Sequence, residues 1–334
     1  MKVAIIGCGL IGRKRALALS SDDKLVACCD SNEEIGVNFA KQFSAIPFED
    51  YKELLTKVEC DTVIVAVVNK FAGEIVVSAL EKGKHVLAEK PLGRNSFEAS
   101  IMNEAVLNSP SGVLLRTGFN HRFHPSIRKA KEMVMLGKIG SIFNIRARYG
   151  HGGRAGMEKE WRASRELCGG GELLDQGVHI IDLIRWFGGD IKEIFGKVET
   201  KFWDMDVEDN ACAILKTQNN VTATFSVSWT NWKNIFSFEI FGMDGYLKIE
   251  GLGGSYGNET LEFGKRKKEG GRPDIELFEF GEEDVSWKDE WMDFKCAIVN
   301  ERTVGADGND GLKANEVVEA IYQSSEKNSV IQLK

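Results

Sequence analysis

The first third of the chain alternates short, continuously apolar runs with longer segments in which apolar residues recur every three or four positions. The apolar runs predict strands at residues 2–6, 24–30, 62–68 and 85–88. The periodic segments predict helices at 11–20, 35–43, 71–82 and 96–107. Strands that are apolar at successive positions are typical of a parallel sheet covered by helices on both faces. The alternation therefore predicts an N-terminal α/β domain built on a doubly wound parallel sheet.

The pattern changes after one more apolar run at 113–119. A single helical segment, 172–187, precedes longer segments in which apolar and polar residues alternate. These alternating segments predict strands at 193–203, 210–217, 222–229, 237–241 and 246–250, with a hairpin turn at Met243-Asp244-Gly245. Helices at 288–300 and 312–325 and a short strand at 330–333 complete the prediction. We therefore expect a domain of residues 1–122 and a second α/β domain of residues 123–334 with a large, mostly antiparallel sheet.

The composition fits this two-domain interpretation and excludes several classes of protein. The length of 334 residues favours two domains, and 43% apolar and 28% charged residues are ordinary for a globular protein. The net charge is −7 and no basic stripe follows a predicted helix, so we expect no nucleic-acid partner. No apolar stretch approaches the roughly 20 residues of a membrane span, and the strand at 2–6 leaves no room for a signal peptide.

The cysteines and one basic run complete this picture. The seven cysteines form no C-x-x-C pair and mostly lie in apolar stretches, which favours a reducing cytoplasm and no bound metal. The run Lys265-Arg266-Lys267-Lys268 lies among glycines and short strand-like segments. We interpret it as a solvated hairpin tip, with the alternative that it steers an anionic substrate.

A glycine-rich turn directly follows the first predicted strand. In Gly7-x-Gly9-x-x-Gly12 the first glycine permits a tight turn, the second lets the backbone approach a pyrophosphate, and the third lets the helix pack closely on the strand. The N-terminus of the following helix offers free N–H groups to phosphates. We therefore assign Gly7, Gly9, Leu10, Ile11 and Gly12 to a dinucleotide site in a Rossmann domain.

An acidic residue stands where such a site needs one. Asp30 ends the second predicted strand, 18 positions after Gly12. A carboxylate there accepts hydrogen bonds from the adenosine ribose and repels a 2′-phosphate, which favours NAD as the cofactor and leaves NADP possible. The alternative is that Asp30 only caps the turn that it forms with Ser31 and Asn32.

Two further motifs carry groups suited to proton transfer. Asp175 and His179 are four residues apart in a predicted helix that follows Gly169-Gly170-Gly171. A carboxylate on the same helical face can orient an imidazole that acts as a base, although such a pair is also common on protein surfaces. Lys90 follows the strand at 85–88 within Glu89-Lys90-Pro91, at the sheet edge where ligands bind. Its ammonium can stabilise a reacting oxygen, or it is an ordinary loop lysine.

These motifs together resemble the glucose-fructose oxidoreductase, inositol dehydrogenase and MocA family. The resemblance spans nearly the whole chain in the same order. It rests on the glycine-rich start and on Glu89-Lys90-Pro91, Gly118-Phe119-Asn120-His121-Arg122-Phe123, Trp161-Arg162 and the segment from Gly169 to Asp182 that reads GGGELLDQGVHIID. It implies a nicotinamide-dependent oxidoreductase with a C-terminal α/β domain whose open sheet forms a homodimer or homotetramer interface.

The resemblance also implies site residues. Lys90, Asp175 and His179 become the catalytic group, and Trp161 and Arg162 lie near the nicotinamide. Relatives often have a T-P-N-x-x-H-like stretch after the fourth strand, whereas this chain has Val67-Val68-Asn69-Lys70-Phe71-Ala72 and keeps only the asparagine. We therefore expect Asn69, with Glu89 and Lys90, among the cofactor contacts.

The expected reaction is reversible oxidation of a secondary alcohol on a sugar, cyclitol or nucleotide-sugar, with a small polyhydroxylated molecule as the partner. His179 accepts the hydroxyl proton, Asp175 orients it and Lys90 holds the reacting oxygen, but the sequence leaves open which of Lys90 and His179 transfers the proton. Residues near the motifs with groups suited to hydroxyls or carboxylates are Arg122, Tyr149, His151, Arg162 and Asp182, with packing or a surface pair as the alternative role of each. Two alternatives remain: a glycosidase that acts by transient oxidation with NAD, and a non-catalytic NAD-sensing regulatory protein.

Overall fold

The computed structural model describes residues 1–299 and 303–333. The chain forms two compact units. The first contains Met1–Asn120, Glu166–Gly169 and Trp287–Asn315, and the second contains His121–Arg165, Gly170–Ser286 and Glu316–Lys334. Among the described residues, no helix is long and apolar enough to cross a membrane.

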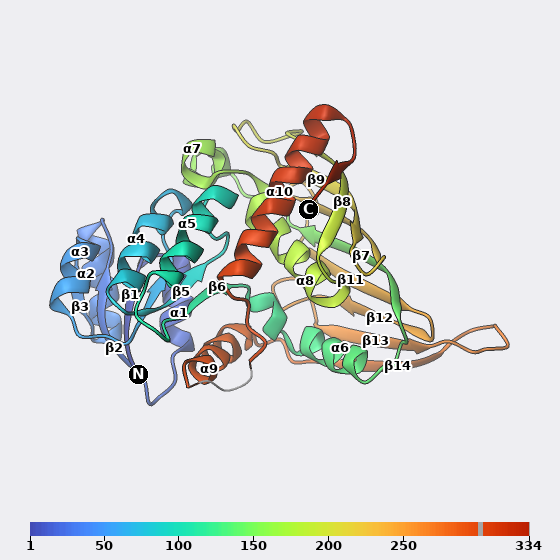
Figure 1. The fold of residues 1–334 in the computed structure, drawn as a ribbon, viewed down its shortest axis with the longest axis horizontal. Coiled ribbons are helices and arrows are strands. Elements are labelled where there is room, and N and C mark those ends of the chain that lie inside the picture. Colours follow the sequence, from blue (N-terminus) through green and yellow to red (C-terminus); the bar gives the residue numbers. More distant parts are fainter. Residues whose placement is uncertain (300–302, 334) are drawn as a thin grey trace. The chain divides into compact units, whose positions relative to one another are not determined.

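The first unit contains a six-stranded parallel sheet (Figure 1). Its strands, in spatial order, are β3 (Ile46–Phe48), β2 (Lys24–Cys29), β1 (Lys2–Ile6), β4 (Thr62–Val65), β5 (His85–Glu89) and β6 (Leu115–Gly118). All five neighbouring pairs are parallel. The order reverses between β1 and β4, and this switch point is where a doubly wound sheet binds its ligand.

Helices cover both faces of this sheet, so successive residues of one strand belong to different cores. Ala4 and Ile6 of β1 pack in the core beneath α3 (Tyr51–Lys57), α4 (Asn69–Glu81) and α5 (Ser96–Leu107). Val3 and Ile5 pack in the core on the opposite face. That second core is covered by α1 (Leu10–Ala18), α2 (Glu33–Phe43) and α9 (Ser286–Ile298). The predicted doubly wound domain is confirmed.

Helix α9 joins the first unit although it comes late in the chain. Trp291 and Phe294 of α9 are each 1% exposed and lie in the same core as Val3 and Ile5 of β1. The indole Nε1 of Trp291 donates to a carboxylate oxygen of Asp23 at 2.7 Å. The sequence-based division placed residues 287–315 in the second domain, because their helical pattern does not show which core they enter. The last residue of the predicted helix 288–300, Asn300, lies outside the described residues.

The second unit contains a nine-stranded sheet (Figure 1). Its strands, in spatial order, are β14 (Asp274–Glu279), β13 (Thr260–Lys265), β12 (Gly245–Glu250), β11 (Ile235–Gly242), β7 (Ile142–Gly150), β10 (Thr222–Ser228), β9 (Asn210–Thr217), β8 (Ile191–Glu199) and β15 (Ile331–Gln332). Neighbours are antiparallel except β7 and β10. The predicted large, mostly antiparallel sheet is confirmed, and the turn at Met243 joins β11 to β12 as predicted.

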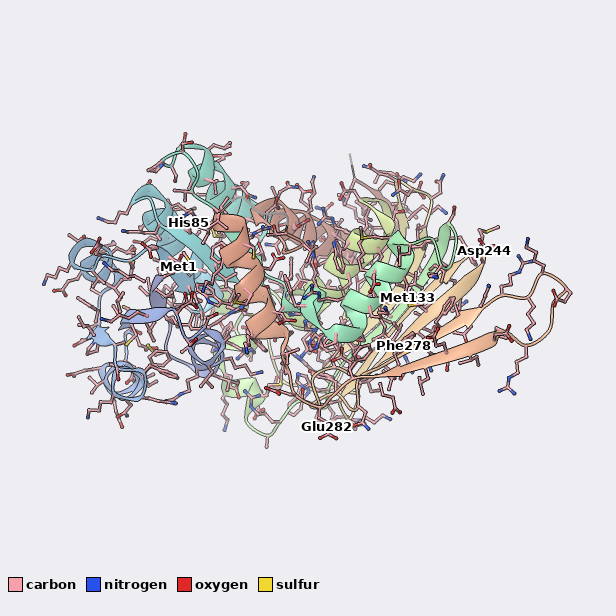
Figure 2. All side chains as sticks on the ribbon, turned by 90° about the horizontal axis from the view of Figure 1, so that it is seen from below. Met1, His85, Met133, Asp244, Phe278 and Glu282 are labelled. Carbon is pink, nitrogen blue, oxygen red and sulfur yellow. The ribbon has the colours of Figure 1, made fainter. Side chains whose placement is uncertain are left out.

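Three helices accompany this sheet. Helix α8 (Val178–Gly188) is almost wholly buried, and its last residue, Gly188, lies against Ile145 of β7. Helix α10 (Gly308–Lys327) has its second half in this unit, where Ser324 Oγ accepts from the N–H of Gly196 at 3.0 Å. Helix α6 (Pro125–Met135) lies along β13 and β14 (Figure 2), with Lys129 Nζ 5.8 Å from the Phe278 ring.

The sequence missed two features that position the site. Strand β7 (Ile142–Gly150) was left without a prediction, although apolar residues alternate along it with Asn144, Arg146 and Arg148. The predicted helix 172–187 is helical, but its residues Leu173–Gly177 form a π-helical turn, η4, before α8 begins. The predicted strand 193–203 ends at Glu199, and the chain turns beyond it.

Candidate functional site

The glycine-rich turn occupies the switch point of the first sheet. Gly7 has a φ of +96°, and a Cβ placed on it would lie 2.2 Å from the carbonyl oxygen of Ala66, just beyond β4. A Cβ on Gly12 would lie 2.0 Å from the carbonyl oxygen of Gly7. Both glycines are therefore required by the packing of the protein itself, as their predicted roles demand.

Gly9 differs from these two glycines. A Cβ placed on Gly9 would meet no atom of the described chain within 4 Å, and its backbone is extended, with φ −72° and ψ −161°. It caps the N-terminus of α1, where no described side chain accepts a hydrogen bond from the first turn and no acidic residue occurs. Free N–H groups beside open space suit an anionic ligand, so the turn fits a dinucleotide pyrophosphate.

Asp30 is held in place by backbone hydrogen bonds. One carboxylate oxygen accepts from the N–H of Cys8 at 2.9 Å, and the other accepts from the N–H of Asn32 at 2.9 Å. The hydrogen bond from Asn32 caps the turn of Asp30, Ser31 and Asn32, which is the alternative role that the sequence offered for Asp30. Each carboxylate oxygen can accept a further hydrogen bond, so the cap leaves Asp30 able to bind a ribose.

Two predicted cofactor residues are tied to the protein. Asn69 is 8% exposed, and its Nδ2 donates to the carbonyl oxygen of Cys168 at 2.7 Å, which anchors residues 166–169 to the start of α4. The Glu89 carboxylate pairs with the buried Arg15 guanidinium at 2.5 Å. These contacts give both side chains a structural role, whereas the sequence proposed only cofactor contacts for them.

Arg15 links α1 to both β5 and α9. Its guanidinium is 1% exposed, lies 4.6 Å from the centroid of the Trp287 ring, and also pairs with the Glu290 carboxylate at 2.5 Å. Burial raises the pKa of Glu290 to about 7, although the Arg15 charge opposes this shift. Because Lys90 follows Glu89 in the chain, this buried network determines where the strand end that carries Lys90 lies.

Three consecutive glycines, Gly169, Gly170 and Gly171, lead into η4. Gly169 has a φ of +89°, a Cβ on Gly170 would lie 2.2 Å from the Tyr322 hydroxyl oxygen, and a Cβ on Gly171 would lie 1.9 Å from the carbonyl oxygen of Glu208. These glycines allow a close approach that a larger residue would prevent. The atoms closest to Gly170 and Gly171 are those of Tyr322 and Glu208, so these two glycines serve the packing of the protein.

Glu208 holds the N-terminus of η4, and nothing in the sequence signalled this role. Its carboxylate accepts from the N–H groups of Gly171 at 3.0 Å and Leu173 at 3.2 Å and from the Tyr322 hydroxyl at 2.8 Å. Burial raises the pKa of Glu208. These contacts fix the turn from which Asp175 projects.

Asp175 and His179 lie at the junction of η4 and α8. The Asp175 carboxylate is partly exposed and lies 3.5 Å from Nε of Arg162, a residue of the turn η3 (Trp161–Ala163). The Arg162 guanidinium in turn lies 4.3 Å from the centroid of the Trp161 ring. The structure thus brings together three residues that the sequence proposed from separate motifs. Local π-helical turns of this kind are frequent at functional sites.

The His179 ring is enclosed by other aromatic rings. It is 4% exposed and stacks on the His121 ring, with the two centroids 3.7 Å apart and an interplanar angle of 20°. Tyr149 meets His121 edge-on at 5.2 Å. His121 was absent from the predicted site residues, although it lies within a motif that carried the family resemblance. Stacking restricts the rotation of the His179 ring and thereby orients its nitrogens.

Hydroxyl groups extend this cluster. Burial raises the pKa of Tyr149 well above its ordinary value and that of Tyr256 to about 12, so both remain neutral phenols. Their rings lie 5.0 Å apart, and Nε2 of Gln176 donates to the Tyr256 hydroxyl at 3.0 Å. The sequence proposed Tyr149 but gave no signal for Tyr256 or Gln176, which only the fold brings here.

Arg122 and Asp182, two of the predicted substrate contacts, pair with each other in the structure. The Arg122 guanidinium donates two hydrogen bonds to the Asp182 carboxylate, from Nε at 2.8 Å and from Nη2 at 2.5 Å. The side chains are 5% and 0% exposed. Because each charged group is buried against the other, the pair supports the chain around His121 and the middle of α8.

His151 lies beyond β7 and has a defined tautomer. Its Nδ1 accepts from the N–H of Gly153 at 2.9 Å, so the proton of the neutral ring is on Nε2. Burial lowers the pKa of His151, whereas the nearby Asp175 charge opposes this shift. The proposed substrate residue is therefore a neutral donor close to Asp175.

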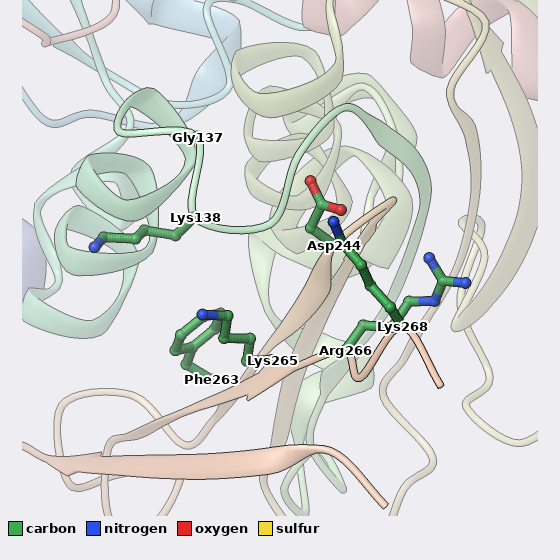
Figure 3. A pocket seen from close by; sticks show the side chains of 7 residues that line it. All are labelled: Gly137, Lys138, Asp244, Phe263, Lys265, Arg266 and Lys268. Carbon is green, nitrogen blue, oxygen red and sulfur yellow. The ribbon is translucent and has the colours of Figure 1, made fainter. Parts of the chain in front are cut away.

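The basic run lies at the tip of the β13–β14 hairpin, as predicted. Lys267 pairs with Asp274 at 2.8 Å. The other three cations line a hollow of about 440 Å³ (Figure 3). The residues that line it are Gly137, Lys138, Asp244, Phe263, Lys265, Arg266 and Lys268. The lysines and the arginine are exposed, which is typical of solvated charges.

The first unit has the order, the glycine turn and the acidic strand end of a dinucleotide-binding Rossmann domain. Residues 1–111 match the family described as an oxidoreductase family with an NAD-binding Rossmann fold, and residues 127–248 match the GFO/IDH/MocA C-terminal domain. The chain belongs to the GFO/IDH/MocA family of oxidoreductases. The predictions of this family, of the α/β fold and of an NAD-binding oxidoreductase are confirmed.

Named relatives cover most of the chain. The chain is 31% identical over 252 residues to dTDP-3,4-didehydro-2,6-dideoxy-alpha-D-glucose 3-reductase of Actinomadura kijaniata, which is 74% of each chain. It is 26% identical over 292 residues to levoglucosan dehydrogenase of Pseudarthrobacter phenanthrenivorans, covering 74% of this chain and 73% of the relative. A solved structure of a levoglucosan dehydrogenase in complex with NADH and L-sorbose has a TM-score of 0.89 at 22% identity, covering 100% of this chain and 99% of the other. This last likeness confirms the fold.

Proposed function

We propose that the protein is an NAD(P)-dependent dehydrogenase or reductase that interconverts a secondary alcohol and a ketone on a sugar, cyclitol or nucleotide-sugar. The family match supports the chemistry, and the names of both relatives describe redox reactions of sugars. Those names favour net redox turnover over the glycosidase and the NAD-sensing regulatory protein considered from the sequence.

The cofactor is proposed to bind at the carboxyl end of β1. Gly9 and the first turn of α1 hold the pyrophosphate, and Asp30 accepts from the adenosine ribose. When bound, the nicotinamide supplies the acceptor or donor for hydride. Of the other predicted contacts, Lys90, Trp161 and Arg162 stay proposals, with Leu10 and Ile11 contributing the backbone of the helix start.

The reacting group is proposed to include Asp175, His179 and Lys90. The imidazole of His179 takes the proton of the substrate hydroxyl, and the Asp175 carboxylate stabilises the imidazolium that results. Lys90 donates a hydrogen bond to the substrate oxygen, which favours its alkoxide-like form. Tyr149 and His151 are proposed as neutral hydrogen-bond partners of the other hydroxyl groups.

One observation carries this assignment. The His179 ring, 4% exposed and stacked at 3.7 Å on His121, lies in a cluster of neutral hydroxyls and imidazoles that also contains Tyr149 and Tyr256. A purely structural histidine does not require such a set of donors and acceptors. A polyhydroxylated substrate does, because each buried hydroxyl left unpaired costs about 1–3 kcal/mol.

A substrate screen tests the proposal. Sugars, inositols and nucleotide-sugars are offered with NAD and with NADP, and turnover is followed by nicotinamide absorbance. For any substrate found, His179→Asn should reduce kcat by about 10²- to 10⁴-fold while NADH affinity is unchanged. His85→Asn serves as the control, because His85 begins β5 at the opposite end from Lys90. Wild-type kcat in His179→Asn contradicts the assigned role.

The assembly and location are proposed as well. We propose a homodimer or homotetramer formed through the open face of the nine-stranded sheet, where Ile214 is 53% exposed and Arg146 stacks on Phe241 at 5.0 Å. A solution mass measurement tests this assembly. We also propose the cytoplasm as the location, because all seven cysteines are free thiols and five of them are buried.

A further inference from the structure

Three aromatic residues form an exposed platform in the second unit: Phe202, Trp203 and Trp232. Phe202 is 60% exposed and Trp232 is 64% exposed. The Phe202 ring meets Trp232 edge-on at 4.8 Å and Trp203 edge-on at 5.1 Å. Single exposed aromatic residues are common, whereas Phe202 joins the exposed Trp232 to the partly exposed Trp203 in one apolar surface of the kind that marks binding sites.

The backbone of Trp232 is in an unusual conformation. Its φ is +57°, a left-handed value that is rare for a bulky side chain. The adjacent segment at residues 151–152 imposes this conformation. The N–H of Asn231 donates to the carbonyl oxygen of His151 at 3.1 Å, and a Cβ on Gly152 would lie 3.0 Å from the Cα of Trp232. Residues held in such conformations cluster at ligand-binding sites.

The base of the platform is equally well fixed. Trp203 Nε1 donates to the carbonyl of Trp229 at 3.0 Å, and a Cβ on Gly153 would lie 2.4 Å from the Trp203 ring. The Asp209 carboxylate accepts from the backbone N–H groups of residues 201–203 at 2.8 to 3.0 Å. The aromatic rings are therefore mounted on a rigid loop, which lowers the entropic cost of binding.

The platform is continuous with the proposed reacting group. His151 bonds to the N–H of Gly153, which packs on Trp203, and its backbone also holds Asn231. The charges of Asp175 and Arg162 both influence His151, so these groups lie near one another. His151 therefore contacts the segments that carry Trp203 and Trp232 and also lies near Asp175.

We propose that this platform binds the group attached to the sugar that is oxidised, by stacking the apolar face of a second ring or a flat aglycone on Trp232 and Phe202. The inference rests on the proposed function and adds a specificity determinant to it. Aromatic faces suit this occupant, because the C–H face of a pyranose and the face of an aryl group both stack on them.

The test compares matched ligands on matched variants. Aryl and methyl glycosides of the oxidised sugar are assayed with the wild type, Trp232→Ala, Phe202→Ala and the control Phe97→Ala, an aromatic residue 71% exposed on α5. We expect Trp232→Ala to lower kcat/KM for the aryl glycoside by roughly 3- to 10-fold, mainly through KM. The methyl glycoside and the Phe97→Ala variant should be unaffected.

Binding and mass measurements keep this test separate from the proposed function. Calorimetric titration of aryl and methyl hexopyranosides into the NADH-loaded protein should show the same preference, and its loss in Trp232→Ala, even if no sugar is turned over. Equal losses for both ligand types, or a change of oligomeric mass in Trp232→Ala, overturn the proposal. The second result would show that the platform is instead a contact between copies of the chain.

Discussion

Replacing Gly9 by alanine separates the needs of the cofactor from those of the protein. The added Cβ meets no atom of the described chain within 4 Å, and alanine readily adopts the extended backbone at this position. The free energy of unfolding should therefore change by no more than about 1 kcal/mol. A pyrophosphate lying against this Cα would instead meet a methyl group, at a cost of about 1–3 kcal/mol, or roughly a 5- to 150-fold weaker NADH complex.

Two other glycines calibrate the measurement. Gly7→Ala combines a φ of +96° with an approach of 2.2 Å to a backbone oxygen, so it should destabilise the fold by about 2–5 kcal/mol. Gly73→Ala lies inside α4, where a Cβ also meets nothing within 4 Å of the described atoms. It should stabilise the protein by up to about 1 kcal/mol and leave NADH binding unchanged.

Denaturant unfolding of the free protein and fluorescence titration with NADH give both quantities for each variant. The expected pattern is a normal fold with weak binding for Gly9→Ala and a normal fold with normal binding for Gly73→Ala. If Gly9→Ala binds NADH as tightly as the wild type, the cofactor does not approach this turn. The assignment of the dinucleotide site to the switch point would then be wrong.

Three further predictions concern buried polar groups. The pKa of Glu290 is about 7 in the folded protein, above its ordinary 4.5, so the stability that its protonated form contributes is fully present below pH 4.5 and is lost as the pH rises through 7. Between pH 4.5 and 7 the unfolding free energy of the wild type should fall relative to that of Glu290→Gln by up to about 1.4 kcal/mol per pH unit, and a constant difference contradicts this. Asp182→Asn leaves the Arg122 charge buried beside a neutral amide and should cost about 3–5 kcal/mol in urea unfolding, most of it recovered when Arg122→Met and Asp182→Leu are combined. Gly170→Ala should lower the unfolding free energy by about 1–3 kcal/mol, and adding Tyr322→Phe should restore part of it, because this change removes the oxygen that lies 2.2 Å from the added Cβ. If the effects of the two changes simply add, that contact is not the cause.

The cofactor half of the molecule was largely predictable from sequence. Its strands are apolar on both faces, its helices are periodic, and the glycine turn has a fixed spacing to the acid at the end of the second strand. All of these are local properties, and the close approach of other backbone atoms to Gly7 and Gly12 agrees with the tight turn and the close helix packing predicted for them. The three-glycine segment was predictable for the same reason, because close approach leaves glycine as the only residue that fits.

The substrate half was predictable only in part. Strand β7 alternates apolar and polar residues and was therefore predictable, whereas the π turn before α8 has no sequence signature that distinguishes it from an ordinary helix. Arg122 and Asp182 carry groups suited to a substrate, but the fold brings them 2.5 Å apart and buries both. A sequence shows which chemical groups a residue carries, but it does not show whether a group binds a ligand or pairs with another residue of the protein.

Local sequence therefore established the class of fold, the cofactor turn and the identity of Asp175 and His179 as a candidate pair. Tertiary structure supplied the partners that give those residues their environment: His121 beneath the His179 ring, Glu208 at the start of η4, and α9 on the face of the first sheet. The physical reason is the range of the interactions. Backbone conformation and periodic burial depend on neighbours in the chain, whereas buried hydrogen bonds and ring stacking join residues far apart in sequence, and their pairing is decided only when the cores are packed.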